Sequence, residues 1–208
     1  MKIDRLLLAT SNSGKLREYR RLAPSSAVTL DLIPGFVDLQ IFDEGAPTFA
    51  ENAAGKALYY SRFADGVVLA EDSGLVVPAL NGAPGVKSAR YAGENATDAG
   101  RVRKLLGEMV GMRDDERAAK FVCVTALACQ GRAIAIISDD VRGSITPEPR
   151  GVNGFGYDPV LFVPEIGKTF AETTAEEKDR LSHRGKAFRK LLAFVMNDDI
   201  DIAAPQRR

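Results

Sequence analysis

Apolar and polar positions along the first third of the chain alternate between two patterns. Four consecutive apolar residues at 6–9 predict a buried strand, and apolar residues then recur at helical spacing over 16–22. The segment AVTLDLI at 27–33 suggests a second strand, and residues 49–64 place their apolar side chains on one face of a second helix. This order of strand, helix, strand and helix is typical of an α/β fold.

A third strand is expected at 67–70, where four apolar residues lead into the polar run Glu71 to Gly74. Because glycine suits a sharp turn and the strand pattern resumes at Leu75, we expect the polar run to interrupt the strand and to lift the carboxylate of Asp72 out of the sheet. Helical spacing returns over 102–109.

The second half of the chain predicts a hairpin and a C-terminal helix. Apolar runs at 121–129 and 132–141 flank Gln130-Gly131, which indicates antiparallel strands, and a glycine-rich segment ends in a short strand near 160–163. Thr174 and Glu177 form a capping-box pattern before a last helix over 188–195. The fold is therefore expected to be α/β around a mixed central sheet flanked by helices. We expect one domain over residues 1–208, with a tail that frays from about 197.

Composition narrows the class of protein. Among 208 residues, 28 basic residues balance 28 acidic ones, so no global field favours nucleic acid or a membrane as partner. The N-terminal apolar run is too short for a signal peptide, so we expect a cytoplasmic location. Cys123 and Cys129 lie six residues apart on one expected strand, which points to unpaired core thiols.

The loop TSNSGK at 10–15, between the first strand and helix, is a candidate phosphate site. Backbone N–H groups of small residues at a helix start can bind an anion. The sequence departs from the P-loop motif, because Ala9 stands for its first glycine and Leu16 for its Ser/Thr. An ordinary strand–helix turn with a Ser or Asn cap is the alternative.

Two groups of acidic residues are candidates for metal or proton chemistry. Asp43-Glu44 precede a helix on which Asn52 and Lys56, four residues apart, share a face, although a solvated helix start would look the same. Glu71-Asp72 end a buried strand, where adjacent side chains point to opposite faces, so that one can serve a site. A turn-capping Asp is the alternative.

The segment GFGYDP at 154–159 holds the third candidate group. Phe155 and Tyr157 between glycines can offer a flat surface for a nucleobase, or they can be core aromatics in a tight turn. His183, the only histidine, is followed by Arg184, and with Lys178 nearby these residues favour recognition of an anion or a carbonyl.

Taken together, TSNSGK at 10–15, Glu51-Asn52-Ala53, the run EDSGLVVPALNGAPGVKSARYAG, GFGYDPVLFVP and LSHRGKA resemble the inosine/xanthosine triphosphate pyrophosphatases. The resemblance runs in order from about Leu6 to Phe194 and is weak only across 98–150. It implies hydrolysis of ITP, dITP and XTP to the monophosphate and pyrophosphate with Mg²⁺. It also implies a twisted mixed sheet in two lobes, with the active site in the cleft, and a homodimer.

Site residues carry over from the resemblance by position. Asp72 would bind the metal and activate water, and Glu44 would be the second metal ligand. The residues implied to bind substrate are Thr10, Ser11, Asn12, Ser13, Gly14, Lys15, Lys56, Ser73, Phe155, Gly156, Tyr157, Asp158, Lys178, His183 and Arg184.

The chain departs from the family pattern at two places. Glu71 stands where the family has Asp, which leaves Asp72 in place, and Glu44-Gly45-Ala46 replaces Glu-Thr-Gly, which leaves Asp43 open as the ligand. Two other functions remain: a pyrophosphatase for modified pyrimidine triphosphates, and a sensor that binds purine nucleotides without cleaving them. A substrate panel with Mg²⁺ separates all three.

Overall fold

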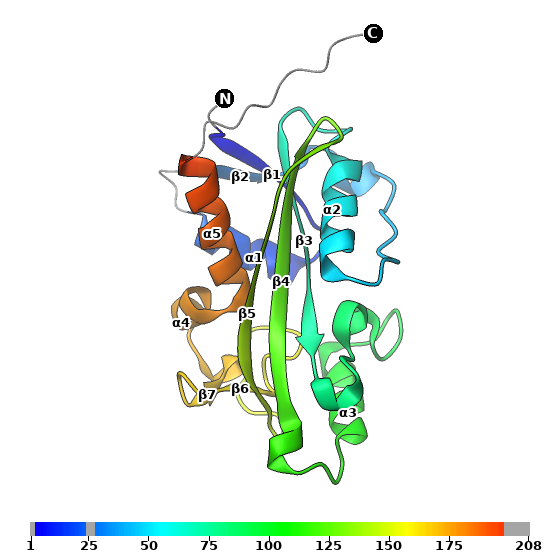
Figure 1. Ribbon diagram of the computed structural model, residues 1–208, viewed down its shortest axis with the longest axis vertical. Coiled ribbons are helices and arrows are strands. Elements are labelled where there is room, and N and C mark those ends of the chain that lie inside the picture. Colours follow the sequence, from blue (N-terminus) through cyan, green and yellow to red (C-terminus); the bar gives the residue numbers. More distant parts are fainter. Residues whose placement is uncertain (1–2, 24–27, 198–208) are drawn as a thin grey trace. The chain divides into compact units, whose positions relative to one another are not determined.

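The computed structural model describes residues 3–23 and 28–197. Its strands are β1 (Arg5–Ala9), β2 (Thr29–Leu32), β3 (Val67–Val76), β4 (Ala118–Cys129), β5 (Arg132–Ile145), β6 (Leu161–Val163) and β7 (Lys168–Thr169). Its α-helices are α1 (Ser13–Leu22), α2 (Phe49–Tyr60), α3 (Asp98–Glu108), α4 (Ala175–Leu181) and α5 (His183–Asn197) (Figure 1). None of the helices in these residues has the length and hydrophobicity of a membrane-spanning segment.

The strands form one mixed sheet in the order β2-β1-β3-β4-β5-β6-β7. β1 pairs in parallel with β2 and with β3, so that Leu6 lies opposite Leu30 on one side and Val67 on the other. β5, β6 and β7 pair antiparallel, with Ser144 opposite Phe162. The predicted α/β fold around a mixed sheet flanked by helices is confirmed.

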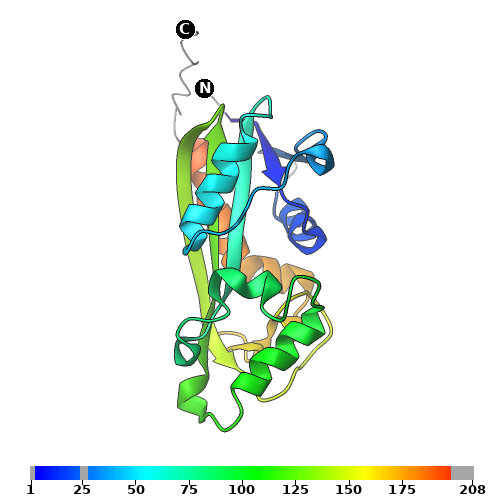
Figure 2. The same cartoon turned by 90° about the vertical axis from the view of Figure 1, so that its right-hand side faces the viewer.

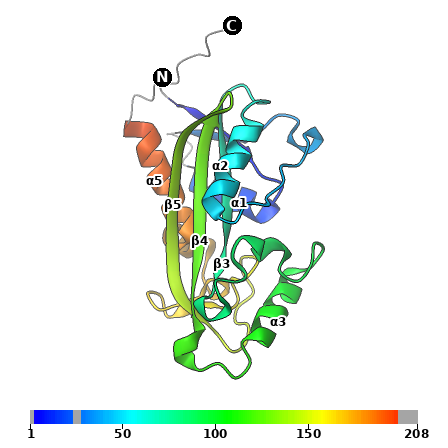
Figure 3. The ribbon, with the colours of Figure 1, turned by 45° about the vertical axis from the view of Figure 1, so that its right-hand side comes forward.

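The hairpin predicted around Gln130-Gly131 is present as β4 and β5, which lie side by side in Figure 3. Both turn residues have positive φ, 50° at Gln130 and 75° at Gly131. This left-handed pair matches the twist of the flanking strands, which explains why a two-residue turn joins them.

By its internal contacts the chain forms two compact units, which are described separately. Unit 1 comprises the described residues of Met1–Asp72, Val124–Ser138 and Ala187–Arg208, and unit 2 comprises Ser73–Cys123 and Asp139–Lys186. The expectation of one bilobed domain over 1–208 stays a prediction.

The core of unit 1 lies between the sheet and helices on both of its faces. Leu8 and Leu69 pack in one buried cluster with Tyr19 of α1 and Phe188 of α5, whose rings meet edge to face with centroids 5.2 Å apart. α2 lies on the face opposite α5 (Figures 1 and 3). Burial on both faces explains why β1 and the start of β3 are apolar without alternation.

Unit 2 has a core of its own around Phe121, Leu161 and Phe170. There α3 lies beside the short 3₁₀ segment Gly85–Arg90 (Figure 2). The buried guanidinium of Arg117 donates to the carbonyl oxygens of Met109, Ile145 and Thr146 at 3.2, 2.6 and 3.0 Å, and so joins three segments of this unit.

The turn predicted at Glu71 to Gly74 is wrong, because β3 continues through these residues to Val76. The glycine serves a close approach instead: a Cβ at Gly74 would lie 2.3 Å from Ser88 Oγ and 2.5 Å from the Gly85 carbonyl oxygen. A turn-capping Asp72 is excluded by the same continuity of the strand.

Other predicted boundaries differ by a few residues. α2 ends at Tyr60 and not near 64, while the capping box of Thr174 and Glu177 is confirmed at the start of α4. Cys123 and Cys129 are buried and form no disulfide, as expected. The predicted start of the second strand at 27 and the tail beyond 197 lie outside the described residues.

Candidate functional site

The loop between β1 and α1 is a capped helix start. The Asn12 side chain accepts a hydrogen bond from the Lys15 N–H at 3.0 Å, and Thr10 Oγ1 accepts one from the Asn12 N–H at 3.2 Å. The Asn cap, which the sequence offered as the alternative to a phosphate site, is therefore confirmed. Because Ser11 and Ser13 are exposed in this same loop, the cap does not compete with the prediction that the loop binds phosphate.

Glu71 and Asp72 have partners on different helices of unit 1. Lys15 Nζ of α1 lies 3.2 Å from Glu71 Oε1, and Asn52 Nδ2 of α2 donates to Asp72 Oδ2 at 3.0 Å. α1 and α2 cover different faces of the sheet, so the expected alternation of the two carboxylates is confirmed.

Asn52 holds Asp72 to the segment that carries Glu44. Its fully buried side chain donates to the Ala46 carbonyl at 3.2 Å and accepts from the Ala46 N–H at 3.0 Å, besides its bond to Asp72. A primary amide is the side chain that can donate to a carboxylate and still pair with both groups of one peptide. Asn52 thus joins Asp72 to the segment that carries Glu44, whereas the sequence placed it on the same helix face as Lys56 without giving it a role.

Lys56 brings a second cation to this group. Its ammonium pairs with Glu44 and donates to the Glu71 carbonyl oxygen at 3.2 Å. Asp43 is exposed, whereas Glu44 is half-buried, so the structure favours Glu44 over Asp43 as the member of the cluster.

The pKa of Asp72 is raised above its ordinary value. Burial is the largest cause, the Glu44 carboxylate acts in the same direction, and Lys15, Lys56 and the Asn52 hydrogen bond oppose both. A carboxylate with a raised pKa that is still flanked by two cations is suited to accept a proton.

The donor chemistry of this cluster fits Mg²⁺. Among the described residues no group of three His, Cys, Asp or Glu side chains could hold a metal ion. Mg²⁺ keeps several waters and is bound through one or two carboxylates together with substrate phosphates, so Glu44 and Asp72 suffice for such a site.

In unit 2, two cations lie near the ring of Phe155. Lys178 Nζ is 4.8 Å and Arg184 Cζ is 5.6 Å from the ring centroid. Lys178 also pairs with Asp158, whose Oδ2 accepts from the Phe155 N–H at 2.8 Å. Phe155 is half-buried, which leaves part of its side chain exposed.

The remaining predicted residues of unit 2 are mostly buried. Arg184 donates to Ser73 Oγ at 3.2 Å, and His183 stacks on Phe121 with ring centroids 4.8 Å apart. Both lie at the start of α5, which begins at His183, five residues before the predicted helix over 188–195. Tyr157 takes the alternative given for it, a core aromatic, and its hydroxyl donates to the Ser88 carbonyl at 3.0 Å.

The predicted residues therefore fall into two groups with different chemistry. Unit 1 holds carboxylates, two lysines and a helix start, which suit a metal and phosphate charge. Unit 2 holds an aromatic ring among cations, which suits a flat, electron-rich or anionic group. Sequence reasoning missed Asp98, whose carboxylate accepts from the Gly156 N–H at 2.7 Å; 58 positions separate the two residues, and no local pattern signals such a contact.

Comparison with known proteins agrees with both the fold and the motifs. The Ham1 family model matches residues 6–194. A protein of Geobacillus kaustophilus named dITP/XTP pyrophosphatase is 47% identical over 186 residues, which cover 89% of this chain and 91% of that protein. A Gloeobacter violaceus protein of the same name is 47% identical over 188 residues, covering 90% and 92%.

Two solved structures are similar to this chain in both sequence and fold. A HAM1 protein from Coxiella burnetii is 40% identical, has a TM-score of 0.84, and the match covers 93% of this chain and 99% of that one. The Ham1 protein of Staphylococcus aureus is 36% identical with a TM-score of 0.81, and the match covers 92% and 97%.

Proposed function

Because the chain belongs to the Ham1 family, we propose that it hydrolyses the deaminated purine nucleoside triphosphates ITP, dITP and XTP to the nucleoside monophosphate and pyrophosphate. The observation that carries this proposal is the setting of Asp72. This buried carboxylate is held by Asn52, and Lys15, Lys56 and Glu44 act on its charge. This activity removes nucleoside triphosphates with deaminated purine bases from the nucleotide pool.

Unit 1 supplies the groups for phosphate chemistry in this proposal. Residues Thr10 to Lys15 bind the triphosphate through the helix start, and the ammonium groups of Lys15 and Lys56 neutralise its charge. Asp72 accepts the proton of the attacking water. Bound by Glu44 and Asp72, Mg²⁺ would supply further neutralisation of the phosphate oxygens. Only the family resemblance places the cut between the α and β phosphates.

Unit 2 supplies the groups for the base. The ring of Phe155 offers a stacking face, with Gly156, Tyr157 and Asp158 completing the loop that carries it. His183 and Arg184 offer donors to the 6-oxygen of hypoxanthine or xanthine, and Lys178 and Ser73 complete the predicted set. Adenine presents a donor at that position, so ATP is expected to be rejected.

A substrate panel tests this proposal. The protein is incubated with ITP, XTP, dITP, GTP, ATP and dUTP in Mg²⁺, and pyrophosphate and orthophosphate are both measured. Pyrophosphate from ITP, dITP and XTP with little from ATP is the expected result. Preference for dUTP would favour the modified-pyrimidine alternative, and binding of ITP without release of pyrophosphate would favour the sensor.

Two further expectations belong to this proposal. A homodimer follows from the resemblance, and sedimentation velocity tests it. A cytoplasmic location fits an enzyme that acts on free nucleotides, with no nucleic acid or membrane as a partner, and fractionation of cells tests it.

A further inference from the structure

The loop that carries Phe155 has a backbone conformation that depends on glycine. Gly154 and Gly156, on either side of Phe155, have φ of +76° and +64°, in the left-handed region. A Cβ at Gly154 would also lie 2.0 Å from Asp158 Oδ2. Glycine permits this conformation but does not enforce it, so other contacts must hold the loop.

Two carboxylates accept the backbone N–H groups at Phe155. Asp158, within the loop, accepts from the Phe155 N–H, and Asp98, the first residue of α3, accepts from the Gly156 N–H at 2.7 Å. The Gly156 N–H belongs to the peptide that joins Phe155 to Gly156. Its orientation therefore fixes ψ of Phe155 and φ of Gly156 together.

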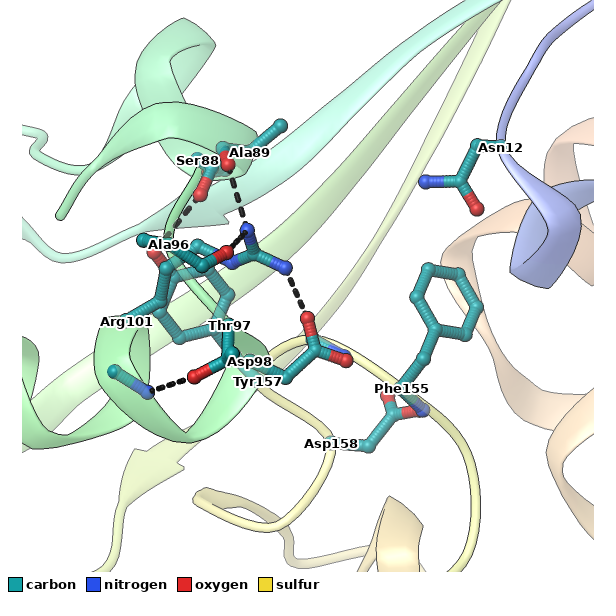
Figure 4. A network of polar contacts seen from close by, with 12 residues as sticks. Asn12, Ser88, Ala89, Ala96, Thr97, Asp98, Arg101, Phe155, Tyr157 and Asp158 are labelled. Atoms are coloured by element: carbon teal, nitrogen blue, oxygen red, sulfur yellow. Dashed lines mark hydrogen bonds and ion pairs between the residues drawn. The ribbon is translucent and has the colours of Figure 1, made fainter. Parts of the chain in front are cut away.

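Asp98 is itself held in place. One carboxylate oxygen pairs with Arg101, whose Nη1 donates to the carbonyl oxygens of Ala89 and Ala96 at 2.8 and 2.6 Å (Figure 4). The other oxygen accepts from the Gly156 N–H. Because its two oxygens serve different partners, Asp98 links Phe155 to the segment before α3.

Asp98 is not required to cap its helix. Thr97 is the N-cap of α3, and its hydroxyl accepts from the Gly100 N–H at 3.1 Å. Removing the Asp98 side chain leaves this cap intact, although it also removes a negative charge from the first turn.

We propose that Asp98 is a positioning residue for base recognition: through the Gly156 peptide it holds the Phe155 ring in the orientation that stacks on the substrate base. This inference rests on the proposed function, because it assigns Phe155 to the base. It adds to the site a residue from a part of the chain where the family resemblance is weak.

Separate binding measurements for the base-containing part and the phosphate part of the substrate distinguish a positioning role of Asp98 from a general loss of protein stability. We would measure the dissociation constants of IMP, which carries the base, and of inorganic tripolyphosphate, which lacks it, for the wild type and for Asp98→Ala and Asp98→Asn. The Ala variant should bind IMP about tenfold more weakly, the loss expected for one hydrogen bond to a charged acceptor, with unchanged binding of tripolyphosphate. The Asn variant should be intermediate, because its oxygen can replace only one of the two carboxylate oxygens, and the NH₂ group in the other position cannot accept a hydrogen bond.

Asp115→Ala is the matched control. Asp115 also lies in unit 2 and pairs with an arginine, with Oδ1 3.1 Å from Arg113 Nε and Oδ2 3.2 Å from Nη2. This pair is exposed, and Asp115 lies in the 3₁₀ segment Asp114–Arg117. Its loss should leave IMP binding unchanged. Equal losses in Asp115→Ala and Asp98→Ala would overturn the inference.

A double-mutant cycle tests whether Asp98 acts through Phe155. In a Phe155→Ala background, Asp98→Ala should have no further effect on IMP binding, whereas an independent structural effect would add. Hydrogen exchange of the 154–158 amides gives a readout that needs no nucleotide, and Asp98→Ala should raise it. Unchanged exchange, additive losses or an equal loss of tripolyphosphate binding each overturn the positioning role. Failure of the wild type to release pyrophosphate from ITP overturns the proposed function instead.

Discussion

Substitution of Gly74 by alanine provides a quantitative test of how β3 packs. The added methyl would lie 2.3 Å from Ser88 Oγ, 2.5 Å from the Gly85 carbonyl oxygen and 2.9 Å from Ser88 Cβ. Ser88 cannot turn away without loss, because its hydroxyl accepts from the Leu75 N–H at 2.9 Å and donates to the Gly85 carbonyl at 2.6 Å. Overpacking of this kind costs about 1–3 kcal/mol, and the fixed backbone oxygen places Gly74→Ala near 3 kcal/mol.

The measurement is chemical denaturation at equilibrium together with thermal melting. A loss of about 3 kcal/mol in a chain of this length corresponds to a fall in Tm of roughly 6–12 °C. Gly107→Ala is the matched control, because Gly107 lies within α3 and a Cβ there meets no atom within 4 Å. In a helix alanine is favoured over glycine by about 0.5–1 kcal/mol, so the same chemical change should stabilise.

Gly74→Ala and Gly107→Ala are therefore expected to change the free energy of unfolding in opposite directions. If Gly74→Ala melts at the wild-type temperature or above it, Gly74 is not a site of close approach, and the case for a turn at this position reopens. If both variants are destabilised alike, added methyl groups are tolerated poorly for reasons unrelated to the contacts of Gly74.

Four further predictions concern the proposed active site. Asp72→Asn should lower kcat by about 10²- to 10⁴-fold in a protein whose circular dichroism is unchanged, because the amide keeps the shape but cannot accept the proton; near-normal turnover would make Glu71 the first alternative base. Lys15→Ala should weaken tripolyphosphate binding much more than inosine binding, as calorimetry would detect, and equal losses would exclude a phosphate role. Activity should vanish in EDTA and return with excess Mg²⁺, whereas full activity in chelator would contradict the metal roles of Glu44 and Asp72. Arg184→Ala, checked for folding first, should lower the ratio of kcat/KM for ITP to that for ATP; a uniform loss on both nucleotides would show that Arg184 does not read the 6-oxygen.

The sequence predicted those parts of the fold that depend on neighbouring residues. The apolar run at 6–9, the Gln130-Gly131 turn and the capping box at Thr174 all express local periodicity or backbone preference, and each is present. The polar run at 71–74 misled for a physical reason: Asp, Ser and Gly favour turns locally, but pairing of β3 within the sheet overrides that preference. Glycine is required at position 74 because Ser88 packs against it, and a contact between residues 14 positions apart is not visible in the local sequence pattern.

The same distinction explains which site residues could be anticipated. Opposite faces for Glu71 and Asp72 follow from the two-residue period of a strand, so the sequence sufficed for that prediction. The partner of Asp72 is 20 positions away, and identifying Asn52 required knowing that α2 covers the face of β3 toward which Asp72 points. Asp98 has no such local signal, because an acidic residue in the first turn of a helix is ordinary and its contact with Gly156 exists only once α3 and the Phe155 loop have folded together. A residue that only orients a loop, as we propose for Asp98, is thus harder to find from sequence than a residue that touches substrate, because any carboxylate at the right place can accept one backbone N–H.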